Sequence, residues 1–430
     1  MNAMCLSNLN DRSPPRLIIS HPGSLQLIFG IFAAAQEIGY DTRLWTGYIY
    51  DEHGFVERLA ARAPEGLRAK LLRELRRRQS DSVPPRSVVR LPWLEFTTVG
   101  ALRLLRRFGS LPSLLGLRNA IFDRLVAREV RRDRPAVVLP VDSAALETIR
   151  AAREIGARSL LNQTIGHVAV GQRILGEEAA LHPAWADSMP TKLPAPLIER
   201  ARREALEADC VLAPSDYVQR TLVEIGVSRD RIRVLPYGVR TDRFAPGPPR
   251  PGSEAPFRIL YVGQISQRKG LSYLLDAVRR LKRKDVELLL VGSVIGAGAG
   301  LRHYDGLFRH IDNRPHSELP DLYRSADLFV YPSLHEGSAQ AIMEAMASGL
   351  PVIVTPNSGS VARDGIEGYV VPIRNSDFLA ERINDLCRDR ERLGVFGAAA
   401  RRRAEEHDWR RYRSGLEEIL RDLTGWPSAQ

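Results

Sequence analysis

Short apolar runs alternate with amphipathic stretches along most of the chain. Apolar runs bounded by Gly, Pro or Asn are typical of buried parallel strands, and the stretches between them have the spacing of helices. The pattern therefore predicts two successive series of strands and helices. The predicted strands are residues 16–20, 41–45, 136–139, 159–162 and 210–213 in the first series, and 258–262, 286–291, 307–311, 328–331, 351–355 and 369–371 in the second.

A stretch rich in Pro and Gly, residues 245–257, separates the two series and is typical of a linker between domains. A chain of 430 residues exceeds the size of one core, so two or three domains are expected. We place a lead-in at 1–15, an N-terminal domain at 16–244 and a C-terminal domain at 258–407. The sequence thus predicts an α/β protein with two doubly wound domains.

Two carboxylates, Glu336 and Glu344, stand eight positions apart around the start of a predicted helix at 338–347. The start of a helix attracts phosphates, and Gly337 would let a ligand approach the backbone. Glu344 lies about two turns along the helix, roughly 10–12 Å away, where it could hold a ribose diol. A nucleotide sugar has this layout of hexose, diphosphate and ribose. For the spacing alone, an ordinary βαβ unit with two glutamates facing solvent is the alternative.

The whole run of residues 327–355, with Glu-Gly before the helix and Glu-Ala-Met-Ala-x-Gly-x-Pro-Val-Ile at its end, resembles the donor-site signature of retaining glycosyltransferases of family 4 (group 1). The resemblance implies the GT-B fold, in which two Rossmann-like domains face a central cleft. It implies that Glu336 holds the hexose and Glu344 the ribose, and that the helix start at Gly337, Ser338 and Ala339 stabilises the diphosphate. No Asp-x-Asp pair is visible, so no metal and no cofactor other than the donor are expected.

A glycine-bounded loop, residues 263–270, precedes the predicted helix at 271–281 and suits a diphosphate. The family resembled has Gly-Arg-x4-Lys-Gly here. Gly263 and Lys269 match that pattern, and the resemblance implies that Lys269 contacts the diphosphate. Gln264 stands where the family has arginine, and the neighbouring Arg268 could compensate. A solvated loop lysine is the alternative for Lys269.

The resemblance adds three weaker candidates. His167 follows a predicted strand, where family members often carry a histidine near the donor hexose, although a lone histidine is more often structural. Arg314 stands in the loop expected near the nucleotide base. Gly23 follows the first strand, where a glycine loop borders the donor phosphates, and a plain turn glycine is the alternative. The last segment, 408–430, is expected to form a helix that crosses back onto the N-terminal domain.

The net charge of +11 is concentrated in one region. Residues 62–134 hold 18 Lys/Arg against 7 Asp/Glu, a surplus of 11. This window lies in a predicted helical insert at about 55–134, where leucines three or four apart stand beside arginines. Such stretches can bind an anionic membrane or an anionic acceptor. Amphipathic helices packed on their own domain are the alternative, and no nucleic-acid motif accompanies the charge.

Three widely spaced cysteines and the lack of an apolar leader or an 18-residue apolar run predict a cytoplasmic protein, and the basic region at 62–134 suggests a peripheral position at the inner membrane face. The expected reaction moves a hexose from a nucleoside diphosphate sugar to a hydroxyl of a glycan or lipid-linked acceptor, with retention, in surface polysaccharide or glycolipid synthesis. Two alternatives remain: a catalytically inactive GT-B protein that binds a nucleotide sugar or glycan, suggested by Gln264, and a nucleotide-sugar epimerase.

Overall fold

The computed structural model describes residues 14–23, 26–76, 78–79, 83–105, 111–189, 193–247 and 256–426. Two compact units account for the chain. The first comprises Met1–Asn162, Glu207–Val211 and Arg413–Gln430, and the second comprises Gln163–Leu206 and Leu212–Tyr412. Residues 248–255 of the predicted linker, and residues 1–13 of the lead-in, lie outside the described residues, and the predicted domain bounds stay a prediction.

The first unit is built on parallel strands, because its apolar runs are buried on both faces. Strand β1 (Arg16–His21) pairs in parallel with β2 (Asp41–Thr46) on one side and with β4 (Val137–Pro140) on the other, so that Ile18 aligns with Arg43 and with Val138. The sheet order is β3-β2-β1-β4-β5-β6-β7. The further strands of this sheet are β3 (Val88–Arg90), β5 (Arg158–Asn162), β6 (Cys210–Ala213) and β7 (Ile232–Val234), of which β7 and the last two residues of β6 are assigned to the second unit.

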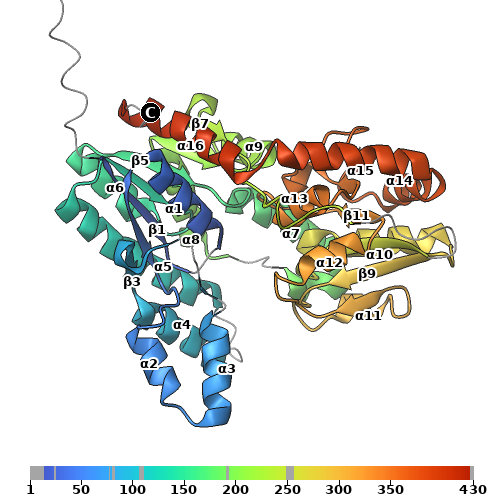
Figure 1. The fold of residues 1–430 in the computed structure, drawn as a ribbon, viewed down its shortest axis with the longest axis horizontal. Helices are drawn as coiled ribbons and strands as arrows, with labels where there is room; N and C mark the ends of the chain where they lie inside the picture. Colours follow the sequence, from blue (N-terminus) through green and yellow to red (C-terminus); the bar gives the residue numbers. More distant parts are fainter. Residues whose placement is uncertain are drawn as a thin grey trace, which may run out of the picture. The chain divides into compact units, whose positions relative to one another are not determined.

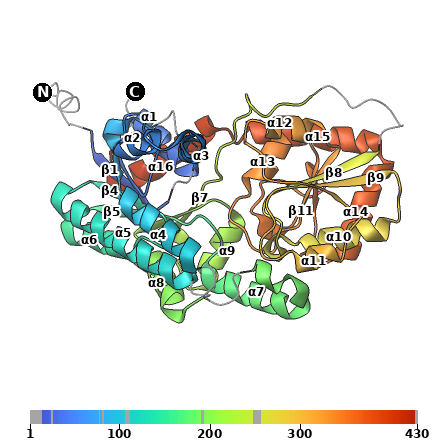
Figure 2. The same ribbon diagram turned by 90° about the horizontal axis from the view of Figure 1, so that it is seen from below.

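Helices cover the strands of the first unit (Figures 1 and 2). Phe122, Val126 and Val130 of one long helix pack with Ile18 and Val138 of the strands in a single apolar cluster. The helices of this unit are α1 (Gln26–Ile38), α2 (Phe55–Ala61), α3 (Glu65–Arg76), α4 (Pro92–Leu105), α5 (Leu111–Asp133) and α6 (Leu146–Ile155), with a short 3₁₀ turn at Pro85–Ser87.

The last helix, α16 (Trp409–Thr424), contributes its residues from Arg413 onward to the first unit. The Thr424 hydroxyl lies 3.1 Å from the Tyr40 hydroxyl, and Arg413 forms an ion pair with Glu37 of α1. These contacts join the end of the chain to its beginning within this unit.

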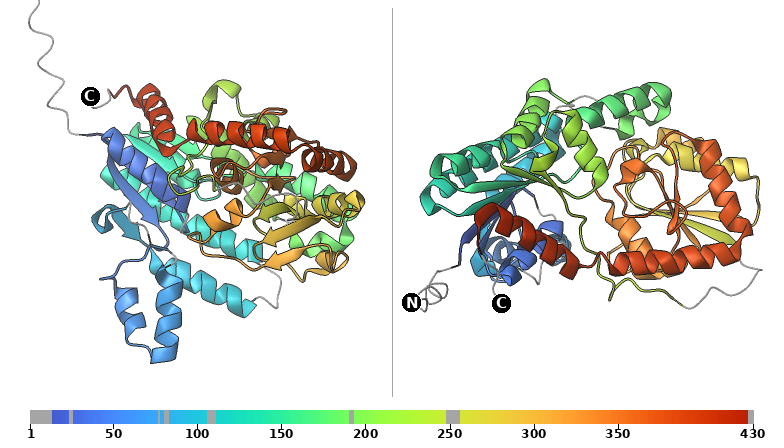
Figure 3. Two further views of the ribbon diagram at one scale, coloured as in Figure 1. Left: turned by 45° about the vertical axis from the view of Figure 1, so that its right-hand side comes forward. Right: turned by 90° about the horizontal axis from the view of Figure 1, so that it is seen from above.

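The second unit contains a six-stranded sheet with the order β10-β9-β8-β11-β12-β13, and every neighbouring pair is parallel. Helices lie on both faces of this sheet (Figure 3). The strands are β8 (Phe257–Val262), β9 (Val286–Val291), β10 (Arg309–Ile311), β11 (Leu328–Tyr331), β12 (Val352–Val354) and β13 (Gly368–Val370). The helices after β8 are α10 (Leu271–Leu281), α11 (Ala299–Arg302), α12 (Leu319–Arg324), α13 (Gln340–Ala347), α14 (Ser376–Arg388) and α15 (Arg390–Glu405).

The second unit also includes helices that precede its sheet in sequence. They are α7 (Val168–Leu181), the 3₁₀ turn η2 (Pro183–Ser188), α8 (Ala195–Glu207) and α9 (Asp216–Glu224), with a further 3₁₀ turn at Arg229–Arg231. Neither α7 nor α8 was predicted from the sequence. In the part of the chain that the structure describes, no helix combines the length and the apolar character needed to cross a membrane.

Candidate functional site

Both predicted phosphate-binding loops follow the two central strands of the second sheet. The strand order reverses between β8 and β11, because β9 and β10 lie on one side and β12 and β13 on the other. Ligands of open α/β sheets bind outside the carboxyl ends of the strands at such a switch point. Residues 263–270 leave β8, and residues 332–339 leave β11. The topology therefore brings the two loops to one place.

Lys269 and Glu336 contact each other at this switch point. The Lys269 ammonium group forms an ion pair with the Glu336 carboxylate and donates to the Tyr331 hydroxyl at 2.6 Å. Arg268 donates to the same carboxylate at 3.1 Å and to the His335 carbonyl at 2.9 Å. Two basic side chains thus share one carboxylate, and an anionic ligand would add a second acceptor for them.

The Lys269 side chain is only 7% exposed. Burial, and secondarily the positive charge of Arg268, lower the pKa of Lys269 well below its ordinary value. The Glu336 carboxylate works in the opposite direction, because it stabilises the ammonium form. An approaching diphosphate would do the same, so ligand binding and protonation of Lys269 favour each other.

Gln264 stands where the family has an arginine. It lies beside Arg268, which was predicted to compensate for that missing arginine. Its side-chain oxygen is 3.4 Å from the Arg268 guanidinium, and its carbonyl accepts a hydrogen bond from the Tyr261 hydroxyl. Gly263 has φ +153°, and an added Cβ would meet the Tyr261 hydroxyl at 3.1 Å. The loop therefore directs the guanidinium of Arg268 toward position 264.

The helix after β11 begins later than predicted. Ala339 is extended and caps α13, which starts at Gln340 rather than at Ser338. The Ala339 N–H, which has no partner within the helix, lies 3.4 Å from the Ser358 carbonyl of a neighbouring loop. Ser338, predicted to belong to the helix, stays in the loop before it.

Gly337 is packed against the chain itself. An added Cβ would lie 1.9 Å from the Thr164 carbonyl oxygen, and the Ser215 hydroxyl donates to the Gly337 carbonyl at 2.5 Å. The Gly166 N–H also donates to the Glu336 carbonyl at 3.0 Å. The loop that carries Glu336 is thus held by two segments, around residues 164–166 and at residue 215.

We expect Gly337→Ala to destabilise the second unit by about 2–3 kcal/mol, because the methyl group meets backbone rather than a flexible side chain. Gly176→Ala on α7 is the matched control, since nothing lies within 4 Å of its added Cβ and alanine favours a helix. Urea unfolding of both variants measures the difference. Equal stability of the two variants would contradict the packing at Gly337.

Glu344 is held by two partners that the sequence did not indicate. One carboxylate oxygen accepts from the Tyr323 hydroxyl at 2.9 Å, and the other lies 2.7 Å from His316 Nε2. Burial and the nearby carboxylate raise the pKa of Tyr323 well above its ordinary value, so the phenol remains a donor. The His316 side chain is far more exposed than Tyr323. An approaching ligand would therefore displace the histidine first.

Arg314 and Gly23 are not joined to this cluster by a described hydrogen bond or ion pair. Arg314 is exposed and lies 3.6 Å from Glu318, four positions later in the loop before α12. Gly23 belongs to the first unit, where its carbonyl accepts from the Thr46 hydroxyl at 2.9 Å and its N–H lies 3.1 Å from His21 Nδ1. In the structure, Gly23 turns the chain after β1.

His167 caps a helix. Its ring Nδ1 accepts from the Ala169 N–H at 3.2 Å, and its own N–H donates to the Thr221 hydroxyl at 2.9 Å. The side chain is fully buried, and Nε2 has no hydrogen-bond partner among the described residues. Burial lowers the pKa of His167 to about 4, so the ring is neutral at pH 7. His167 thus caps the start of α7, and its contact with a donor hexose stays a prediction.

His335, which sequence reasoning missed, lies directly before Glu336. Its Nδ1 is 2.7 Å from the Tyr217 hydroxyl, and its ring fills the space beside Gly166 and Gly171, where an added Cβ would approach to 2.7 and 2.5 Å. Burial and then the Arg268 charge lower the pKa of His335 to about 4. The sequence analysis predicted a role only for the Glu-Gly dipeptide that follows His335. A single buried histidine belongs to no spacing pattern that would have identified it.

A buried polar network fixes the turn that carries Arg268 and Lys269. Gln267 is fully buried, and its side-chain amide donates to Glu178 of α7 at 2.7 Å. Glu178 also accepts from the Tyr273 hydroxyl and from Arg374, each at 2.8 Å. Its carboxylate is fully buried and satisfied by these donors, so it anchors the turn rather than a ligand. The Glu178 position gave no signal in the sequence because α7 was not predicted.

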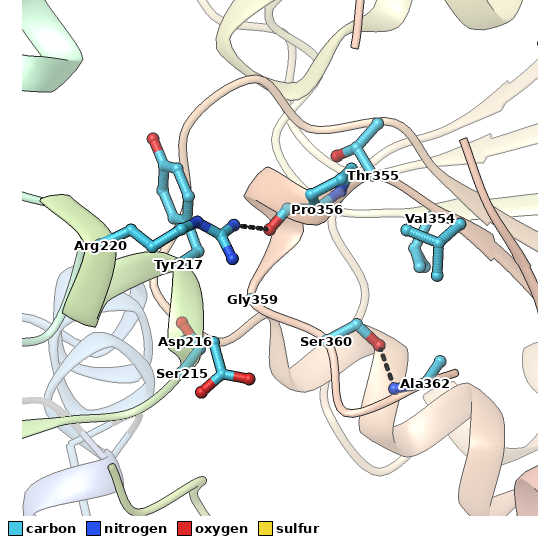
Figure 4. A pocket seen from close by; sticks show the side chains of 11 residues that line it. Ser215, Asp216, Tyr217, Arg220, Val354, Thr355, Pro356, Gly359, Ser360 and Ala362 are labelled. Atoms are coloured by element: carbon cyan, nitrogen blue, oxygen red, sulfur yellow. Dashed lines mark hydrogen bonds between the residues drawn. The ribbon is translucent and has the colours of Figure 1, made fainter. Parts of the chain in front are cut away.

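A cavity of about 130 Å³ lies near this site but is lined by other residues (Figure 4). It lies between the start of α9 and the loop after β12. Arg220 on its wall donates to the Pro356 carbonyl at 3.2 Å, and the Ala362 N–H donates to the Ser360 hydroxyl at 3.0 Å. None of the site residues predicted from the sequence lines it. Across the described ranges, no group of three or more His, Cys, Asp and Glu is placed to hold a metal ion.

Comparison with solved structures shows the fold. A crystal structure of HepE from Anabaena in complex with UDP and glucose superposes with a TM-score of 0.62 and 15% identity, covering 95% of this chain and 100% of that one. Sucrose-phosphate synthase from Thermosynechococcus elongatus superposes with a TM-score of 0.68 and 19% identity, over 96% and 100% of the two chains. The chain therefore has the GT-B fold with two parallel Rossmann-like sheets, as the sequence predicted.

Two family models match parts of the sequence. Residues 256–389 match the family described as "Glycosyl transferases group 1", and residues 180–243 match "Glycosyltransferase Family 4". The D-inositol 3-phosphate glycosyltransferase of Nocardia farcinica is 31% identical over 242 residues, 49% of this chain and 52% of that relative. The enzyme of the same name from Paenarthrobacter aurescens is 32% identical over 243 residues, 50% and 59% of the two chains. The matched stretch spans little more than half the length of these relatives.

Proposed function

We propose that the chain is a retaining glycosyltransferase that moves a hexose from a nucleoside diphosphate sugar to a hydroxyl acceptor. The observation that carries the proposal is the pair of cations, Lys269 and Arg268, on the single carboxylate of Glu336 at the switch point of the second sheet. The two basic side chains suit a diphosphate. The structural neighbour HepE was crystallised in complex with UDP and glucose, which supports a nucleotide-sugar donor.

In this proposal, the cations bind the donor by its diphosphate and stabilise the charge that grows on the leaving group. The acceptor hydroxyl forms the new bond to the anomeric carbon while the bond to the phosphate oxygen breaks. The proton of the acceptor passes to the departing diphosphate on the same face, which preserves the anomeric configuration. Glu336 exchanges contact with Lys269 for contact with hexose hydroxyls, and no metal ion is needed.

Arg268 takes the part that arginine plays at position 264 in the family. Its guanidinium already lies beside the Gln264 side chain and on the Glu336 carboxylate. A planar guanidinium can contact two phosphate oxygens at once. The departure at Gln264 is therefore compatible with catalysis in this proposal, and the inactive binding protein is the less favoured function.

We further propose that the acceptor is an anionic or lipid-linked hydroxyl compound, reached at the inner membrane face. The surplus of Lys and Arg in residues 62–134 supports an anionic partner. The name of the related enzymes, D-inositol 3-phosphate glycosyltransferase, also supports a negatively charged acceptor.

Purified protein and a panel of nucleotide sugars test the proposal. Thermal stabilisation selects the donor, and release of nucleoside diphosphate in the presence of candidate acceptors measures transfer. NMR of the product then reports the anomeric configuration. Donor binding without turnover on any acceptor would indicate a binding protein, and isomerised sugar nucleotide formed without acceptor would indicate an epimerase.

We expect Glu344→Gln to raise the donor KM by on the order of 10- to 100-fold, with a smaller change in kcat, because a charged acceptor for two ribose hydroxyls is lost. Steady-state kinetics at saturating acceptor measure this split. Glu318→Gln is the control, since Glu318 is exposed and pairs only weakly with Arg314. A fall in kcat with an unchanged donor KM would contradict a ribose contact at Glu344.

A further inference from the structure

Two short helices of the first unit, α2 and α3, form a hairpin (residues 55–76) that extends away from the sheet (Figures 1 and 3). One face of the hairpin has a small core of its own, in which Ala60 and Leu75 pack with Tyr48 and with partly buried Val56 and Leu72. That face therefore has its partners within the unit.

The carboxylate of Glu57 also points to the packed face. It accepts hydrogen bonds from the Tyr48 hydroxyl at 2.5 Å and from the Asp51 N–H at 2.8 Å, and it is buried. The acidic group of α2 is thus removed from the exposed face of the helix.

Large apolar side chains of the hairpin are also exposed. Phe55 is 73% exposed and Leu59 is 59% exposed, and the two stand one turn apart on α2. Leu67 is 51% exposed and Leu71 is 37% exposed, again one turn apart on α3. Four such side chains on one small hairpin differ from the singly scattered apolar residues that are normal on a surface.

Arginines flank these apolar residues. Arg58 and Arg62 are exposed on and just after α2, and Arg68 and Arg73 are exposed on α3. None of the four forms an ion pair with another described residue, whereas many arginines elsewhere in the described chain do. Residues 55–76 hold six Lys or Arg and three Glu, so the hairpin has a surplus of positive charge.

We propose that the α2–α3 hairpin docks the protein on an anionic lipid bilayer, with Phe55, Leu59, Leu67 and Leu71 in the acyl boundary and the arginines at the headgroups. Helices that expose apolar and cationic side chains together lie in the interface of anionic membranes. The long arginine stems can reach upward from the apolar boundary to lipid phosphates. A protein partner is less favoured, because exposed arginines that form no ion pair with a described residue, beside exposed apolar side chains, match an anionic lipid surface in both charge and polarity.

This inference deepens the proposed function, because a docked first unit would meet a lipid-linked acceptor at the membrane. Its test is independent of that function, since vesicle binding is measured without donor or acceptor. Failure of the wild-type protein to bind vesicles, with intact transfer to a soluble acceptor, would contradict the docking surface alone. Intact vesicle binding without transfer to any acceptor would contradict the proposed reaction alone.

Flotation of the full chain with phosphatidylcholine vesicles, with and without phosphatidylglycerol, tests the proposal. We expect binding to the anionic vesicles that weakens as salt increases, and at least tenfold weaker binding to phosphatidylcholine alone. The double variant Phe55→Ser/Leu59→Ser should bind at least tenfold more weakly. The double variant Arg58→Gln/Arg62→Gln should lose about fivefold for each arginine removed.

Val395→Ser and Arg402→Gln on α15 are the matched controls, because Val395 is as exposed as Leu59 and Arg402 is exposed. Circular dichroism establishes that every variant is folded. Wild-type protein that does not float with anionic vesicles, hairpin variants that bind like the wild type, or controls that lose binding equally would each overturn the proposal. So would a dimer in the absence of vesicles that only the Phe55→Ser/Leu59→Ser variant abolishes, because the face would then bind a second copy of the chain.

Discussion

Replacing Lys269 with methionine is expected to lower kcat/KM for the nucleotide-sugar donor by on the order of 10²–10³. Methionine keeps the length and the apolar stem of the side chain but removes the ammonium group that contacts Glu336 and the Tyr331 hydroxyl. In a site as buried as this one, a lost positive charge is poorly replaced by water. Steady-state kinetics of nucleoside diphosphate release measure the effect.

The folded state should survive this change. Lys269 is buried and its ammonium is costly to desolvate, so an apolar side chain of similar length is expected to be close to neutral for stability. Glu336 keeps its hydrogen bond from Arg268. Lys284→Met, at an exposed position between α10 and β9, is the control for loss of a lysine. Retention of full activity in Lys269→Met would remove the proposed role of the cation pair.

The sequence was most informative where the chain obeys a simple period. The strand at 286–291 and the helix at 271–281 were predicted with the bounds that the structure has, because the first is a clear apolar run and the second has a helical spacing between breakers. The predicted start of α13 was wrong by two residues, 338 instead of 340. Ala339 bonds to the carbonyl of Ser358, and no local pattern reveals such a distant partner.

Helix α7 shows a second limit of sequence reasoning. It follows β5 after five residues, and the turn signals around His167 favoured a loop. The helix instead starts at a histidine cap, which is an uncommon choice beside Ser, Thr, Asp and Asn. With α7 absent from the prediction, the contact of Glu178 with Gln267, 89 positions later, had no basis in the sequence.

In the candidate site, too, the sequence motifs identified the charged residues but not the residues that contact them. The sequence singled out Lys269, Arg268 and Glu336 separately, on the strength of a resemblance, and the structure brings all three into contact across 67 or 68 positions. The partners of Glu344 could not be named in advance, because Tyr323 and His316 belong to no motif. Motifs identify candidate ligand-binding residues, whereas the tertiary packing determines which side chains form hydrogen bonds with them.

Exchanging Glu336 for glutamine is expected to act in opposite directions on stability and on binding of the nucleotide. The neutral amide leaves Lys269 and Arg268 without their shared carboxylate, which should lower the free energy of unfolding of the second unit by about 2–3 kcal/mol. The same change removes the negative charge that competes with a diphosphate. UDP should therefore bind more tightly to the variant and raise its melting temperature by more than that of the wild type.

Transfer should nevertheless fall by on the order of 10²-fold, because an amide cannot accept hydrogen bonds from the hexose as a carboxylate does. Glu367→Gln is the matched control, since Glu367 is a fully buried carboxylate paired with Arg363 in the same unit. That variant should lose stability but keep the UDP affinity and kcat of the wild type. Weaker UDP binding to Glu336→Gln, measured by calorimetry, would show that Glu336 does not oppose the diphosphate and that the cations at the switch point serve the fold alone.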